Sequence, residues 1–158
     1  MGFLGLKTKK KLTDSVEDTL AQIEHDMVSH CAGYADYQPK RTFIVVANES
    51  NYISVTFFFE LHKKIYRYNE LENVSKNYDA SPEKQEETLK FLNKQARKII
   101  KIFKREERDV PTITKMEYNS HNHSFKVDYI YENAYEGERS NAAEAFAQDW
   151  MREQEINL

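Results

Sequence analysis

The clearest pattern of hydrophobic and polar positions in the chain runs from Tyr52 to Glu60. Apolar side chains occupy every second position of this segment: Ile53, Val55, Phe57 and Phe59. The positions between them form the opposite face of a strand: Ser54, Thr56 and Phe58. β-branched and aromatic residues fill the segment without Gly or Pro, which predicts the central strand of an antiparallel sheet. Phe58 is then either covered by the C-terminal helix around Trp150 or exposed as a binding anchor.

Strand patterns also occur in four further segments: Arg41 to Ala47, Ile65 to Leu71, Thr112 to Tyr118 and Phe125 to Glu132. A short polar turn such as Asn119 to Ser124 joins neighbouring strands and favours antiparallel pairing. For residues 64–71 a short helix is the alternative, because Leu61, Ile65 and Tyr68 also follow helical spacing.

Helical periodicity occurs in three segments: Thr13 to Ala32, Ser81 to Arg105 and Ser140 to Gln154. The second has the clearest beginning, because Ser81 is a good N-cap and Pro82 suits the first helical position. Its acidic residues precede its basic ones, as the helix dipole favours. Thr13 offers a cap for the first helix, and Gly33 is expected to follow its last residue as a C′ glycine.

The predicted elements follow the order α-β-β-β-α-β-β-α. Short connections favour antiparallel hairpins, and helices packed on one face of the sheet give a two-layer α+β domain. A chain of 158 residues is long enough to bury a core of its own. We therefore expect residues 1–12 to be a basic N-terminal tail and residues 13–158 to form a single domain.

Charged residues make up 31% of the chain, and the net charge of −3 is too small to indicate a partner by itself. The distribution of charge along the chain is more informative, because residues 90–108 are strongly basic and the chain is acidic from Asp128 onward. Cys31 is the single cysteine, so no intramolecular disulfide is expected. The chain has no signal-peptide pattern and no apolar run near the roughly 20 residues of a membrane span. We expect a cytoplasmic protein without membrane contact.

No motif for catalysis or for a cofactor is present. Four scattered glycines cannot build a phosphate-binding loop. Cys31 and a histidine could form a nucleophile and its base, but Cys31 lies on an apolar helical stripe, which favours a buried, inert thiol. His121 and His123 could share a metal, but they lie in a polar turn without further ligands nearby in the sequence. We expect no enzyme activity, no cofactor and no metal.

Protein binding is the function that these residues favour. The candidate contacts are acidic and aromatic side chains: Asp128, Glu132, Tyr135, Glu136, Glu138, Tyr66 and Tyr68. Tyrosine anchors with flanking carboxylates suit a basic protein partner, because opposite potentials speed association. The alternative for each tyrosine is a place in the core.

Two further functions stay open. A nucleic-acid-binding protein would use the basic residues of 90–108 as a phosphate stripe, although the mild acidity of the whole chain argues against nucleic acid. A generic protein-interaction adaptor is the other alternative. For the chain itself we expect a monomer or a weak homodimer.

The segments from Pro111 to Tyr118 and from Phe125 to Glu132 form a predicted hairpin that follows a long amphipathic helix and precedes a C-terminal helix. This hairpin and the order of elements from Thr13 to Trp150 resemble the YezG-like antitoxin (immunity) family of bacterial polymorphic toxin systems. The resemblance implies inhibition of a cognate toxin, often a nuclease, by tight binding. Acidic side chains would occlude the basic active cleft of that toxin.

Overall fold

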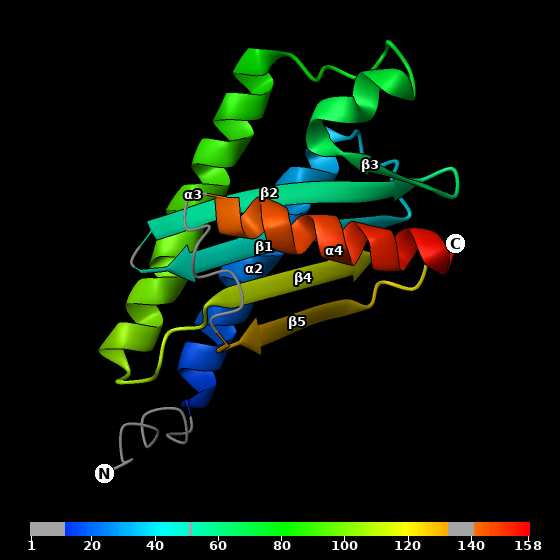
Figure 1. Ribbon diagram of the computed structural model, residues 1–158. Helices are drawn as coiled ribbons and strands as arrows, with labels where there is room; N and C mark the ends of the chain where they lie inside the picture. Colours follow the sequence, from blue (N-terminus) through cyan, green and yellow to red (C-terminus); the bar gives the residue numbers. More distant parts are fainter. Residues whose placement is uncertain (1–11, 51, 133–140) are drawn as a thin grey trace.

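The computed structural model describes residues 12–50, 52–132 and 141–158 (Figure 1). The elements follow one another as α2 (Asp14–Tyr34), β1 (Arg41–Glu49), β2 (Tyr52–Leu61), β3 (Lys64–Arg67), the 3₁₀-helix η2 (Tyr68–Asn73), α3 (Pro82–Arg105), β4 (Ile113–Asn119), β5 (Phe125–Ile130) and α4 (Ala142–Ile156). The α+β class and the predicted order of the main elements are confirmed. Within the described residues, no helix is long and apolar enough to span a membrane.

The sheet has five strands in the order β3-β2-β1-β4-β5, and every neighbouring pair is antiparallel. Its central strand is β1, so the prediction that β2 lies at the centre was wrong. The side chains of β1 are buried on both faces, with Phe43 and Val45 on one and Ile44 and Val46 on the other. A continuous apolar run of this kind is typical of a strand covered on both sides.

Helices cover both faces of the sheet, whereas the sequence had suggested two layers with the helices on one face. In Figure 1, α2 and α3 lie behind the sheet and α4 crosses in front of it. Phe58 lies on the face of the sheet that α4 covers, and it is only 1% exposed. Its ring stacks on that of Phe43 at 4.5 Å between centroids and meets Trp150 edge-on at 5.4 Å. Of the two alternatives for Phe58, cover by the C-terminal helix is the one realised.

The core accordingly has two parts. The larger part fills the space between the sheet and the helices α2 and α3, with Met27, Phe57 and Phe103 among its fully buried members. The smaller part lies under α4, where the small side chains of the helix allow close approach: Ala142, Ala143 and Ala147. The N–H of Ala143 donates to the hydroxyl of Ser54 at 3.2 Å, which gives one amide in the first turn of α4 a partner.

The N-cap residues predicted for α2 and α3 lie at the starts of these helices. The Thr13 hydroxyl accepts a hydrogen bond from the N–H of Val16, and Ser81 caps α3 with Pro82 in its first turn. Residues 64–71 combine both alternatives, because β3 ends at Arg67 and η2 begins at Tyr68.

The end of α2 differs from the prediction that Gly33 is the C′ residue. The helix continues through Tyr34, and Asp36 adopts a positive φ of 54° beyond it. The N–H of Tyr37 then donates to the carbonyl of Ala32 at 2.8 Å, which closes the last turn. Gly33 instead makes room for a neighbour, because a Cβ there would lie 3.0 Å from the Tyr37 hydroxyl.

Candidate partner-binding surface

Beside α4, the sheet presents a hollow lined by both charged and aromatic side chains. Helix α4 packs over β1, β2 and β3, and the strands β4 and β5 lie beside it (Figure 1). The hollow has a volume of about 230 Å³ and is lined by Lys115, Glu117, Lys126, Asp128, Trp150, Glu153 and Gln154. We call it the β4–α4 hollow, with the two strands as its floor and the flank of α4 as its wall.

The alternation of side chains along the strands explains the charged floor. Met116 points into the larger core and Ile113 into the smaller one, so Lys115 and Glu117 share the α4 side of β4. In the register of β4 and β5, Lys115 is opposite Asp128 and Glu117 is opposite Lys126. Opposite charges that face each other across strands contribute about 0.2–1 kcal/mol per pair. The floor therefore alternates in sign.

Aromatic side chains of α4 hold Lys115 at the wall. Its ammonium lies 4.4 Å from the ring centroid of Trp150 and 5.8 Å from that of Phe146. Contacts of a cation with the face of an aromatic ring contribute about 0.5–1 kcal/mol at exposed sites. Lys115 therefore ties the floor of the hollow to its wall.

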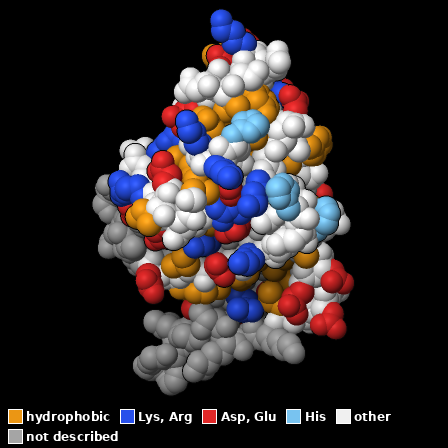
Figure 2. All heavy atoms as spheres, turned by 90° about the vertical axis from the view of Figure 1, so that its right-hand side faces the viewer, with side chains coloured by type: hydrophobic (Ala, Val, Ile, Leu, Met, Phe, Trp, Pro, Cys, Tyr) orange, Lys and Arg blue, Asp and Glu red, His pale blue; other side chains and the backbone are white. Residues whose placement is uncertain are grey.

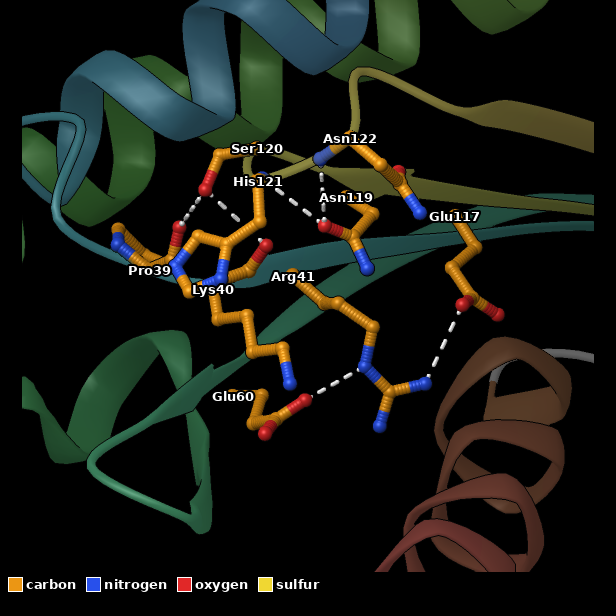
Figure 3. Close-up of polar contacts among 9 residues, drawn as sticks. All are labelled: Pro39, Lys40, Arg41, Glu60, Glu117, Asn119, Ser120, His121 and Asn122. Carbon is orange, nitrogen blue, oxygen red and sulfur yellow. Dashed lines mark hydrogen bonds and ion pairs between the residues drawn. The ribbon is translucent and has the colours of Figure 1, made fainter.

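A second set of charges borders the hollow at the start of β1 (Figure 3). The Arg41 guanidinium donates to Glu60 at 2.5 Å and to Glu117 at 3.2 Å. The three side chains are only 17%, 5% and 22% exposed. Because Arg41 holds the Glu117 carboxylate, Asp128 and Glu153 are the more accessible carboxylates of the hollow.

The turn between β4 and β5 is fixed against β1 (Figure 3). The Ser120 hydroxyl donates to the carbonyls of Pro39 at 2.9 Å and of Lys40 at 3.2 Å. Asn119 accepts hydrogen bonds from the N–H groups of the two residues that follow Ser120. Figure 2 views this end of the molecule, where Lys and Arg side chains gather with Asp and Glu between them.

The two histidines of this turn lie at the surface. The Nδ1 atom of His123 lies 3.0 Å from the hydroxyl oxygen of Tyr118. His121 is exposed. In the described part of the chain, no group of three or more His, Cys, Asp or Glu side chains is arranged to hold a metal ion. Cys31 is fully buried, and burial raises the pKa of its thiol.

The residues predicted to bind a partner are divided among different places. Asp128 lines the hollow, and Glu132 is exposed just beyond β5, where its carbonyl accepts a hydrogen bond from Thr112 at 2.6 Å. Tyr66 and Tyr68 lie at the opposite edge of the sheet and pack against the larger core. Three predicted contacts lie outside the described residues: Tyr135, Glu136 and Glu138.

Tyr68 belongs with the core rather than with the hollow. Its ring stacks on that of Phe57 at 4.8 Å, and burial raises the pKa of its hydroxyl. The structure therefore separates these tyrosines from Asp128. Lys115 and Trp150 were not predicted as site residues. Strand alternation could have identified Lys115, because it lies on the face opposite Met116, which is buried in the larger core.

A buried carboxylate on the other side of the sheet was also missed. Glu24 of α2 is 4% exposed and accepts a hydrogen bond from the Tyr129 hydroxyl of β5. Burial raises the pKa of Glu24 to about 7, and the hydrogen bond from Tyr129 offsets part of that rise. Helical spacing could have revealed it, because Glu24 lies four residues after Leu20 and seven before Cys31 on the buried stripe.

The outward face of α3 is a basic ridge of exposed side chains: Lys90, Lys94, Arg97, Lys98, Lys101, Lys104 and Arg105. Among the described residues, ion pairs hold two of them, Lys90 to Glu86 and Arg105 to Glu106. Arg108 does not belong to the ridge, because it lies beyond the helix and its guanidinium is 5.8 Å from the ring centroid of Phe103.

A scan against protein-family models and a search of curated proteins found no match for this chain. The inference of function therefore rests on the residues and their geometry. The β4–α4 hollow combines carboxylates and lysines that a protein partner can contact with a wall packed around the buried Trp150.

Proposed function

We propose that the protein is an immunity protein that binds a cognate bacterial toxin at the β4–α4 hollow and blocks the basic active site of that toxin. The observation that carries this proposal is the open, charged floor of β4 and β5 beside the aromatic flank of α4. The occupant would be a nuclease domain whose substrate cleft is lined by Lys and Arg.

The chemistry of the hollow supports a basic occupant. Asp128 and Glu153 offer accessible carboxylates, and Trp150 lies in the wall between them and the core. Carboxylates at the rim of an interface steer a basic partner and raise its association rate, most strongly at low salt. Lys115 and Lys126 would contact carboxylates of the same partner, which adds specificity.

The family resemblance supports the same surface. It is carried by the segments from Pro111 to Tyr118 and from Phe125 to Glu132, and these include β4 and β5, the floor of the hollow. The floor is also rigid, because Arg41 and Ser120 anchor it to β1. A preformed surface loses little conformational entropy on binding.

The first test is co-purification with the product of the adjacent upstream gene and protection of cells from that product. Absence of both a complex and protection would contradict the proposal. The surface is tested with Glu153→Lys, which reverses a charge in the hollow, against Glu155→Lys on the exposed side of the same helix. We expect the first variant to slow association about tenfold at low salt and the second to leave it unchanged.

The basic ridge of α3 favours nucleic-acid binding as a second candidate function. Its cations repeat every three or four residues along one helix face, so they could contact successive phosphates. A gel-shift titration at low salt tests this with a variant that replaces Lys94, Arg97 and Lys101 by Ala. Lys76→Ala, an exposed lysine outside α3, is the control. Salt-sensitive binding that only the triple variant loses would support this function, and no shift at low salt would rule it out.

A further inference from the structure

The open sheet ends in two edge strands of different character. At one edge, β3 is four residues long, and Arg67 at its end forms an ion pair with Glu144 of α4. At the other edge, β5 has six residues, and Lys126 and Asp128 are exposed along it. An edge strand of this length presents backbone N–H and C=O groups that can pair with another strand.

The hydrogen-bond pattern identifies which residues of β5 direct those groups outward. In antiparallel strands, the residues of one strand bond alternately to its two neighbours. Thr112 and Ser120 bond to β1, through Asn48 N–H to Thr112 at 2.8 Å and Ser120 N–H to Lys40 at 2.8 Å. Thr112 precedes β4, and its own N–H donates to the carbonyl of Ile130 on β5 at 2.8 Å. Within β4, the register predicts that even-numbered residues bond to β1 and odd-numbered residues bond to β5.

The other side of β4 follows the same rule. The N–H of Asn119 donates to the carbonyl of Ser124 at 2.9 Å, and the register continues this pairing to Lys126, Asp128 and Ile130. The residues between them direct their N–H and C=O groups toward the edge at which no other described strand pairs with β5: Phe125, Val127 and Tyr129.

We propose that β5 pairs in antiparallel orientation with β5 of a second copy of this chain, about a two-fold axis at Val127. This register places Lys126 opposite Asp128 of the second copy, and the symmetry repeats the pair. On the other face of the sheet, Phe125 lies opposite Tyr129 of the second copy. The directly opposed pairs are Val127 with Val127 and, twice by symmetry, Phe125 with Tyr129. Each pair forms two backbone hydrogen bonds, which gives about six in total.

The charges of β5 select this register over its neighbours. A two-fold axis at Lys126 or at Asp128 also satisfies the backbone pattern, but each places like charges opposite each other across the axis. Like charges directly opposite are destabilising, whereas opposite charges and aromatic pairs stabilise a strand pair. The axis at Val127 avoids both clashes and uses every outward backbone group of the strand.

The pairing has a consequence for the second face of the sheet. A two-fold axis perpendicular to the sheet keeps the α4 side of both copies on one face. The two β4–α4 hollows then adjoin across the paired β5 strands and form one trough with an α4 helix on each side. The dimer does not require the proposed toxin binding, because its hydrogen bonds come from the backbone of β5, although Lys126 and Asp128 also line the hollow.

Sedimentation equilibrium of the full chain tests the pairing through charge exchange. The wild type is expected to rise from a monomer of 18.7 kDa toward twice that mass with concentration. Lys126→Glu and Asp128→Lys each place like charges across the axis and should weaken dimerisation about tenfold. The double exchange restores opposite charges and should restore the dimer. Lys64→Glu on β3 is the control for Lys126→Glu, because both variants change the net charge by the same amount.

A cross-link tests the register itself. Directly opposed residues of this kind have Cα atoms about 5.5 Å apart, which a disulfide can bridge. Val127→Cys should therefore yield a disulfide-linked dimer under mild oxidation, and Tyr52→Cys, exposed on β2, should not. Cys31 is fully buried and does not compete. In sedimentation, three results would each overturn the proposal: a wild type that stays monomeric, single exchanges without effect, or a double exchange that fails to restore the dimer. In cross-linking, equal yields of dimer from the two cysteine variants would also overturn it.

Discussion

The hydroxyl of Tyr129 on β5 donates a hydrogen bond to the buried carboxylate of Glu24 on α2. The bond joins the first helix to the last strand across the larger core, where Tyr129 also meets the ring of Phe103 edge-on at 5.2 Å. Burial raises the pKa of Glu24 from 4.5 to about 7, so its protonation couples the stability of the fold to pH.

The free energy of unfolding should fall as the pH rises from about 4.5 to above 7. In this window the folded chain keeps the proton on Glu24, while the unfolded chain has released it, so higher pH favours unfolding. The loss is at most about 3 kcal/mol. Urea unfolding at pH 5 and pH 8 measures it. Glu24→Gln should flatten the dependence, and Glu17→Gln, exposed on the same helix, should not. Equal slopes for wild type and Glu24→Gln would contradict this assignment.

Tyr129→Phe should destabilise the protein by about 1–3 kcal/mol, because it leaves the buried Glu24 without its hydrogen-bond donor. The pKa of Glu24 should rise further, since the Tyr129 hydroxyl favours the charged form of the carboxyl. NMR titration of the Glu24 carboxyl carbon measures the second effect. Tyr118→Phe removes an exposed hydroxyl contact with His123 and serves as the control. An unchanged Glu24 titration would count against the hydrogen bond.

Trp150→Ala should cost about 3–5 kcal/mol, because Trp150 fills the smaller core against Phe43 and Phe58. It also removes the ring over which the Lys115 ammonium lies. Denaturant unfolding followed by circular dichroism gives the change. Ile156→Ala, on the same helix but 82% exposed, should change stability by less than about 0.5 kcal/mol. Similar losses in the two variants would mean that α4 does not depend on Trp150 for its packing.

Gly33→Ala should stabilise the protein by about 0.5–1 kcal/mol. Gly33 lies inside α2, where Ala has the higher helix propensity. The added methyl group would approach the Tyr37 hydroxyl, which is the far end of a side chain that is 70% exposed and can move aside. Thermal unfolding of Gly33→Ala in the wild type and in a Tyr37→Ala background tests this. A gain that appears only in the Tyr37→Ala background would show that Tyr37 cannot move.

Much of the fold could be predicted from local signals. The N-caps Thr13 and Ser81 and the alternation in β2 are encoded within a few residues of the elements they define. Asp128 was predicted as a candidate contact, and it lines the hollow. The hollow itself could not be predicted, because its wall depends on where α4 packs. The places of Tyr66 and Tyr68 depend on which strand lies beside β2.

The sequence by itself determined the class of the fold, the order of its elements and most of their boundaries, because hydrophobic periodicity and capping act over a few residues. Only the tertiary structure decided that β1 is central, that α4 covers Phe58 and that Glu24 meets Tyr129. These contacts join residues far apart in the chain. Their stability comes from burial and pairing between elements, which no short stretch of sequence contains.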